Sequence, residues 1–163
     1  MKVNVYTDGA CSGNPGKGGY GIIMEWVGKP YTREFSEGYR LTTNNRMELL
    51  AVIVALEQLK KEGIEVVVYS DSKYVVDSVE KKWVFNWVKK GFKNKKNADL
   101  WKRFLVVYKK QDVKFHWIKG HNEHPQNERC DLLAVAAAKK ETLLIDEGFE
   151  NSQNDADGKL NLK

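Results

Sequence analysis

The chain has 163 residues, a length that suits one domain burying about two-thirds of its unfolded surface. An apolar content of 42% with five Trp, seven Tyr and six Phe excludes a disordered chain. The sequence has no run of 18 apolar residues, so we predict no membrane-spanning segment. The N-terminus enters a strand pattern at once, and Cys11 and Cys130 lie far apart. We therefore expect a cytoplasmic monomer without membrane contact, signal peptide, disulfide framework or thiol metal site.

The net charge of +5 is unevenly distributed along the chain. Residues 81–110 contain eleven Lys or Arg and one acid, whereas residues 141–163 contain six acids and two lysines. A cationic segment beside an acidic remainder indicates a polyanionic partner. The alternative is a lysine-rich helix that only faces solvent.

In chain order, the pattern first predicts three antiparallel strands and a helix. Alternation predicts strands at Val3–Asp8, Tyr20–Val27 and near Tyr31–Tyr39, the first of them ending at Asp8. Threonine and asparagine at 42–45 then cap a helix that runs to about Glu62, where a glycine stops it.

The remainder alternates strands and helices. Three consecutive valines predict a strand at Glu65–Ser70, and Ser72 caps the helix that follows. Helices at Ala98–Gln111 and Asn127–Lys140 flank a strand at Val113–Lys119. Strands separated by helices are usually parallel. We therefore predict an α/β arrangement, a mixed five-stranded sheet of three antiparallel strands plus two parallel ones, with helices on both faces.

The composition after about residue 149 is typical of disorder. We accordingly divide the chain into a domain, 1–149, and an acidic, polar C-terminal tail, 150–163.

Four carboxylates stand in or beside apolar stretches: Asp8, Glu48, Asp71 and Asp131. Structural alternatives exist for the first three, namely a hairpin turn, a capping box begun by Asn45, and an N-cap. A mid-helix aspartate such as Asp131 has no such explanation. If Asp8 and Asp71 end neighbouring strands, they lie about 5 Å apart. Carboxylates gathered there repel unless cations neutralise them, which indicates Mg²⁺ or Mn²⁺ in a two-metal phosphodiester cleavage site.

Two other kinds of site are rejected. The glycine-rich run 13–19 is not a P-loop, because glycine rather than Ser or Thr follows Gly16-Lys17. His116, His121, His124 and Cys130 match no common zinc spacing.

Five motifs between Lys2 and about Phe149 resemble bacterial-type, stand-alone type 1 ribonuclease H: TDGACSGNPGKGGYG, TTNNRMEL, YSDSKYVVDSV, NWVKKGF and IKGHNEHPQNERCDLLA. The resemblance implies a ribonuclease H-like fold for the predicted sheet. It also implies an endonuclease that hydrolyses the RNA strand of RNA–DNA hybrids, leaving 5′-phosphate and 3′-hydroxyl ends. It implies two Mg²⁺ ions, which Mn²⁺ can replace, held by Asp8, Glu48, Asp71 and Asp131. It also implies that His121 assists proton transfer or product release.

By the same resemblance, substrate-binding residues fall into three sets. The first lines the minor groove, where 2′-hydroxyls distinguish RNA from DNA: Cys11, Gly13, Asn14, Asn44, Asn45 and Glu48. The second holds a DNA-strand phosphate: Thr43 and Asn86. The third set lies in the basic segment, residues 81–110: Trp83, Trp87, Lys89 and Lys90. The spacing of the two tryptophans also allows both to pack into the core.

Two departures and two rival functions stay open. Leu41 stands where some relatives carry a phosphate-binding arginine, which makes Arg40 a candidate replacement, and the basic segment is shorter after Phe92 than in the best-known members. The rivals are a DNA nuclease of the same fold and a catalytically silent nucleic-acid-binding module. The asparagines argue against the first rival, and the four carboxylates argue against the second.

Overall fold

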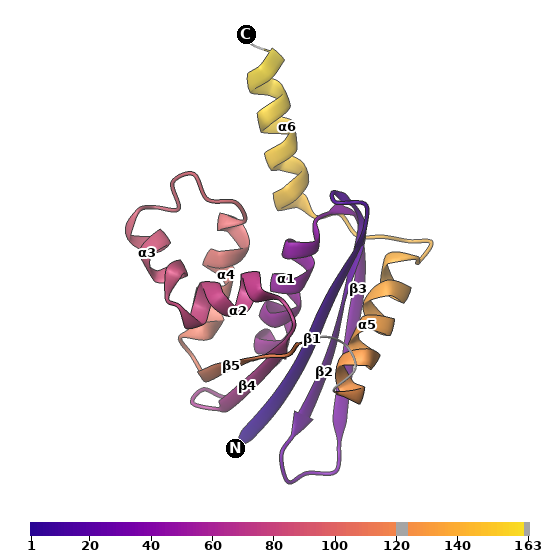
Figure 1. Cartoon of the computed structure of the whole chain (residues 1–163), viewed down its shortest axis with the longest axis vertical. Coiled ribbons are helices and arrows are strands. Elements are labelled where there is room, and N and C mark those ends of the chain that lie inside the picture. Colours follow the sequence, from indigo (N-terminus) through magenta and orange to yellow (C-terminus); the bar gives the residue numbers. More distant parts are fainter. Residues whose placement is uncertain (120–123, 162–163) are drawn as a thin grey trace.

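The computed structural model describes residues 1–119 and 124–161. Five strands form one sheet in the order β3-β2-β1-β4-β5 (Figure 1). They are β1 (Lys2–Ser12), β2 (Gly16–Trp26), β3 (Thr32–Thr42), β4 (Glu65–Ser70) and β5 (Asp112–Trp117). The pairs β1–β2 and β2–β3 are antiparallel, whereas β4 pairs in parallel with both β1 and β5. The predicted mixed sheet is confirmed.

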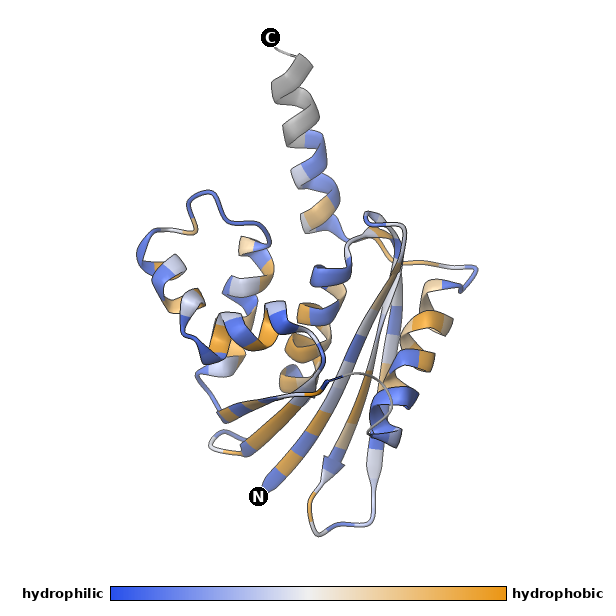
Figure 2. Cartoon of the chain, viewed as in Figure 1, coloured by the Kyte–Doolittle hydropathy of each residue, from blue (hydrophilic) through white to orange (hydrophobic). Residues whose placement is uncertain are grey.

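Helices pack on both faces of this sheet (Figure 1). The helices of the described chain are α1 (Asn44–Glu57), α2 (Lys73–Glu80), α3 (Trp83–Lys89), α4 (Ala98–Tyr108), α5 (Pro125–Ala138) and α6 (Glu147–Asn161), of which α1 and α5 lie on the sheet and α6 projects away from it. Val3 and Val5 of β1 enter the main core with α1, whereas Tyr6 packs against Cys130 of α5. Figure 2 shows this alternation of hydrophobic and hydrophilic residues along the central strands.

Strands β1 and β2 are longer than the sequence pattern predicts, since the glycine-rich run continues the ladder. The pairing runs past Asp8, which lies opposite Gly21, to a turn at residues 13–15. Asp8 therefore lies within β1, so the predicted strand end at Asp8 is wrong, and the alternative of a hairpin turn at Asp8 does not apply. The parallel pairing of β1 with β4 does end nearby, at Tyr6 and Tyr69.

Glycine at position 21 lets α5 lie directly on the sheet opposite Asp8. A Cβ atom at Gly21 would overlap the carbonyl oxygen of Cys130 and approach the Cβ atom of Leu133 to 2.8 Å. Backbone atoms of a packed helix cannot move aside as the end of a side chain can. This close approach brings Asp131, the next residue of α5, to the cavity that Asp8 also lines.

Helix α1 ends at Glu57, not near Glu62 as predicted. The chain after it must turn into β4, and Gln111 fixes that turn with its side-chain amide. The amide oxygen accepts the backbone N–H of Ile64 at 2.8 Å, and the amide nitrogen donates to the carbonyl of Lys61 at 2.8 Å. Hydrogen bonds from a residue 47 and 50 positions away thus stabilise the turn between α1 and β4.

The C-terminal segment forms α6, which corrects the prediction of disorder. Phe149 is buried, its backbone N–H donates to Asp146 at 3.3 Å, and Arg40 of β3 forms a bidentate ion pair with Glu150 at 2.9 and 2.8 Å. The ion pair with Arg40 joins residues 110 positions apart, so the composition of the segment cannot reveal it. Residues 149 and 150 both lie within α6. The division of the chain into a domain and a tail between them stays a prediction. Across residues 1–119 and 124–161, none of the helices has the length and apolar character that crossing a membrane requires.

We expect Gly21→Ala to lower the free energy of unfolding by about 3 kcal/mol, because α5 must move away from β2. Gly28→Ala is the matched control. Its φ is +82° but nothing lies within 4 Å of the added Cβ, so only backbone strain of about 1 kcal/mol opposes it. Urea denaturation measures both losses. Equal losses would show that α5 does not depend on close contact at Gly21.

Candidate active site

Three carboxylates from separate elements meet where β1 and β4 separate. Asp8 lies on β1, Glu48 in α1 and Asp71 directly after β4, and one oxygen of each lies within 4.8 Å of the others. Asp8 and Asp71 each stand two residues beyond the last β1–β4 pair, so they reach the same level of the sheet. Asp8 is 3% exposed and Glu48 4% exposed. The structure thus gathers three of the four predicted metal ligands.

Asp131, the fourth, lines the same cavity, whose volume is about 420 Å³. It is half-buried on α5 and is not part of the group that meets within 4.8 Å. Asn44 and Asn45, at the start of α1, also line this cavity. The cavity therefore combines carboxylates from both faces of the sheet with polar side chains at its rim.

The structural alternatives for these carboxylates are wrong. The N-cap of α1 is Thr43, whose hydroxyl accepts a backbone N–H at 3.2 Å, so Glu48 forms no capping box with Asn45. The N-cap of α2 is Ser72, whose side chain accepts a backbone N–H of the first turn, and not Asp71. Neither Glu48 nor Asp71 is therefore explained by a role in capping the start of a helix.

The backbone N–H of Gly9 holds two of the carboxylates side by side. It donates to Oδ1 of Asp8 at 2.9 Å and to Oε1 of Glu48 at 3.1 Å. The other oxygen of Glu48, Oε2, is buried and has no hydrogen-bond partner among the described residues. A buried carboxylate oxygen without a donor is unfavourable, and a divalent cation would satisfy it. The residues present therefore fit such a cation.

Burial and mutual repulsion raise the pKa values of this cluster. Burial first, and then the charge of Asp71, raises the pKa of Asp8 to about 7. Burial, followed by the charges of Asp8 and Asp71, raises the pKa of Glu48 well above its ordinary value. Without a cation the cluster retains protons at neutral pH.

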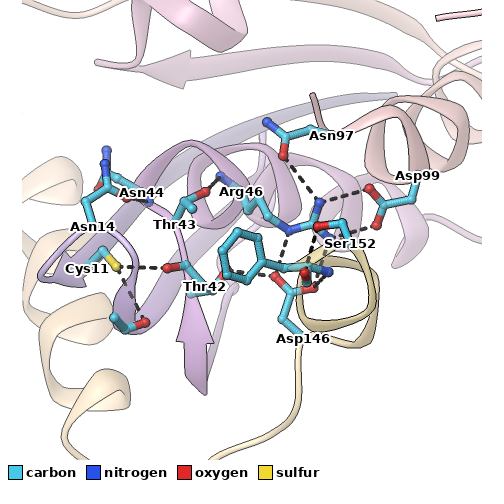
Figure 3. A network of polar contacts seen from close by, with 12 residues as sticks. Cys11, Asn14, Thr42, Thr43, Asn44, Arg46, Asn97, Asp99, Asp146 and Ser152 are labelled. Atoms are coloured by element: carbon cyan, nitrogen blue, oxygen red, sulfur yellow. Dashed lines mark hydrogen bonds and ion pairs between the residues drawn. The ribbon is translucent and has the colours of Figure 1, made fainter. Parts of the chain in front are cut away.

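Side-chain hydrogen bonds join the β1–β2 turn to the start of α1 (Figure 3). Asn14 accepts the backbone N–H of Asn44 at 3.1 Å, and the thiol of Cys11 contacts the carbonyl oxygens of Gly13 and Thr42 at 2.8 and 3.4 Å. Asn14 is thus bonded to Asn44, which lines the carboxylate cavity, whereas Asn14 and Cys11 themselves line two other cavities.

Arg46 anchors this rim, and the sequence pattern did not indicate it (Figure 3). Its guanidinium is 3% exposed and forms bidentate pairs with Asp146, at 2.7 and 2.8 Å, and with Asp99, at 2.8 and 2.7 Å. Asp146 also accepts the hydroxyl of Thr42 at 2.7 Å. The planar guanidinium matches two carboxylates at once. Because these partners lie 100 and 53 positions from Arg46, no local motif signals them.

A second cavity, of about 680 Å³, adjoins the rim at Thr43. Its lining includes Lys95 and Lys96 from the basic segment, whereas Asn86 is not among the described residues that line it. Arg40, the candidate replacement for a phosphate-binding arginine, is instead engaged in its ion pair with α6. Thr43 thus shares this cavity with two lysines.

The two tryptophans of α3 have different surroundings. Trp83 is 43% exposed, with the ammonium of Lys81 lying 5.4 Å from its ring centroid. Trp87 packs edge-on against the buried Trp101, with ring centroids 5.9 Å apart. Core packing thus explains Trp87 and leaves Trp83 at the surface, where the lysines at 89–90 are also exposed.

His121 lies in residues 120–123, outside the part of the chain that the structure describes. Cys130 is fully buried, and its thiol donates to the carbonyl of Tyr6 at 3.3 Å. Its packing between α5 and β1 accounts for this cysteine without a metal.

In chelator at pH 8, we expect Asp8→Asn to be more stable than wild type by on the order of 2 kcal/mol. The folded-state pKa of Asp8, about 7, lies above its unfolded value near 3.9, so its ionisation destabilises the fold as pH rises between these values. The advantage should therefore disappear near pH 4. Thermal unfolding from pH 4 to 8 measures it, and Asp112→Asn, at an exposed carboxylate, is the control. An advantage independent of pH would contradict the clustering.

Comparisons with known proteins agree with this geometry. The profile of the RNase H family matches residues 1–139. A ribonuclease H of Desulforamulus reducens is 55% identical over 150 residues, which cover 89% of this chain and 92% of that protein. A ribonuclease H of Lachnoclostridium phytofermentans is 52% identical over 159 residues, which cover 92% of this chain and 100% of that protein.

Two solved structures have the same fold. LC9-RNase H1, a type 1 RNase H with the type 2 active-site motif, aligns with a TM-score of 0.76 at 35% identity, covering 92% of this chain and 79% of its own. LC11-RNase H1 in complex with an RNA/DNA hybrid aligns with a TM-score of 0.60 at 26% identity, covering 83% of this chain and 96% of its own. In sequence and in fold, the chain belongs to the ribonuclease H family.

Proposed function

We propose that this chain hydrolyses the RNA strand of RNA–DNA hybrids at two Mg²⁺ ions, which Mn²⁺ can replace, held by Asp8, Glu48, Asp71 and Asp131. The observation that carries the proposal is the meeting of three carboxylates within 4.8 Å. Two of them are buried, and one of these has an oxygen that lacks a donor among the described residues. The hybrid bound to LC11-RNase H1 supports the substrate class. The proposed products carry 5′-phosphate and 3′-hydroxyl ends.

When bound, the cations would activate a water molecule and neutralise the charge that develops on the phosphodiester. The residues of the chain itself hold the carboxylates and the substrate-binding side chains in place. The N–H of Gly9 holds Asp8 and Glu48 side by side, while Asn44 and Asn45 stand at the cavity rim. Amide side chains donate and accept hydrogen bonds, so they can recognise the 2′-hydroxyl that separates RNA from DNA. From the resemblance we assign proton transfer or product release to His121.

The DNA strand is assigned to the other side of the rim. Thr43 shares its cavity with two lysines, and these provide the charge that one backbone phosphate requires. The strand then continues over α3, where we place the remaining predicted contacts, Trp83, Asn86, Trp87, Lys89 and Lys90. The monomeric state and the cytoplasmic location stay predictions of the sequence.

Asp71→Asn should lower the rate of hybrid cleavage at least about 10³-fold, because a ligand charge is lost while the side chain keeps its shape. Hybrid affinity in chelator should stay within about threefold of wild type. The assay compares labelled hybrid, RNA duplex and DNA duplex, each with Mg²⁺ and with chelator, and Asp112→Asn is the matched control. Cleavage by Asp71→Asn within tenfold of wild type would reject the carboxylate assignment. Cleavage of the DNA duplex, or of no substrate, would favour one of the rival functions.

Replacing five lysines of the basic segment by glutamine should raise KM and flatten its dependence on salt: Lys89, Lys90, Lys93, Lys95 and Lys96. Each lost phosphate contact removes about 0.9 from the log–log slope, whereas kcat should change far less, since these groups bind substrate and transition state alike. The matched control replaces five exposed lysines elsewhere: Lys2, Lys29, Lys61, Lys114 and Lys140. If both variants show the same slope, the segment only faces solvent.

A further inference from the structure

A lysine stands in the wall of the acidic cavity. Lys73, the first residue of α2, lines it together with Asp8, Asp71 and Asp131. Its ammonium lies 4.7 Å from the ring centroid of Trp117, the last residue of β5. Neither the sequence motifs nor the mechanism above assigns a role to this pair.

Trp117 is itself fixed to the segment that carries Asp71. Its indole N–H donates to the carbonyl of Asp71 at 3.3 Å. The next residue, Ile118, is 2% exposed and donates its backbone N–H to the carbonyl of Ser70 at 2.9 Å. The indole nevertheless remains 38% exposed. A cation over an aromatic face is attracted by the ring quadrupole, so the ring restrains the ammonium of Lys73 beside the cavity.

The charge of the cavity indicates what this ammonium binds. Once the carboxylates hold cations and a scissile phosphodiester, the phosphates on either side of it belong to the same strand and lie nearby. An ammonium is a compact charge with three donors, which suits a single phosphate. Restraint by the ring also reduces the conformational entropy that a long lysine side chain loses on binding.

We propose that Lys73, held by Trp117, binds a phosphate of the RNA strand next to the one that is cleaved. This inference rests on the proposed function, because that function assigns the RNA strand to the carboxylates. It gives the RNA strand a cationic contact of its own, separate from the DNA-strand contacts at Lys95 and Lys96.

The first test is steady-state kinetics of Lys73→Gln on a hybrid at several salt concentrations. One lost phosphate contact should raise KM about fivefold to tenfold near 0.1 M salt and reduce the log–log salt slope by about 0.7–0.9, with kcat within about twofold. Lys73→Arg should stay close to wild type, since a guanidinium also stacks on the ring and binds phosphate. Lys29→Gln, the same charge change in the β2–β3 turn, should have no effect.

An unchanged salt slope in Lys73→Gln would overturn the proposal. A change confined to the Mg²⁺ concentration that gives half-maximal activity would also overturn it, because Lys73 would then act on the cation site and not on the substrate.

The second test uses a short hybrid with one cleavage site, in which a single methylphosphonate removes the charge of one phosphate. Placed in the RNA strand beside the cleavage site, it should raise the KM of wild type about as much as Lys73→Gln does. It should have little further effect on that variant, since both changes remove one contact. Additive penalties, or a penalty only in the DNA strand, would reject the contact while leaving the proposed function intact. Failure of wild type to cleave any hybrid would instead reject the function.

Discussion

Repulsion between buried carboxylates is the constraint on which the rest of this structure depends. Asp8, Glu48 and Asp71 stand close together, with the first two buried, so they cannot all be ionised without a cation, and the raised pKa values of Asp8 and Glu48 express this. The fold must therefore hold the three against their own repulsion. It does so by placing Asp8 and Asp71 just beyond the last β1–β4 pair. The two strands still set the distance between these residues there, but the strands are no longer paired with each other.

The supports of this cluster come from residues that carry no chemistry themselves. The amide of Gly9 bridges two carboxylates, and the missing side chain of Gly21 lets α5 approach with Asp131. Arg46 joins the start of α1 to the first turn of α4, through Asp99, and to the residue before α6, Asp146 (Figure 3). Buried ion pairs contribute little net stability, because desolvation offsets their attraction. We regard the Arg46 network as a device that sets geometry, since its bidentate pairs fix the relative orientation of three segments.

The distribution of charge around the cavity suits the binding of a polyanion. A purely acidic cavity would repel a nucleic acid, but its edges carry cations at three places, Lys73 on one wall and Lys95 and Lys96 beyond the rim. Attraction from these edges raises the local concentration of a polyanion, while the acidic centre reserves the innermost position for cations. The aromatic rings under two of these ammonium groups, Trp117 beneath Lys73 and Trp87 beneath Lys95, hold the charges at the surface.

The sequence by itself determined the order of the elements, the mixed sheet, and the carboxylates as candidates. These features depend on neighbours within a few positions, so they can be recognised in the sequence. They are the periodicity of apolar residues, helix caps such as Ser72, and charged residues within apolar stretches. Only the tertiary structure decided that Asp8 lies within a strand, that α6 forms, and that Arg46 and Lys73 belong to the site. The register of β1 with β2 depends on a helix far along the chain packing against glycine, and Arg46 meets partners 53 and 100 positions away. Such contacts arise only when the whole chain is compact, because no residue near any of these positions encodes the partner that it will meet.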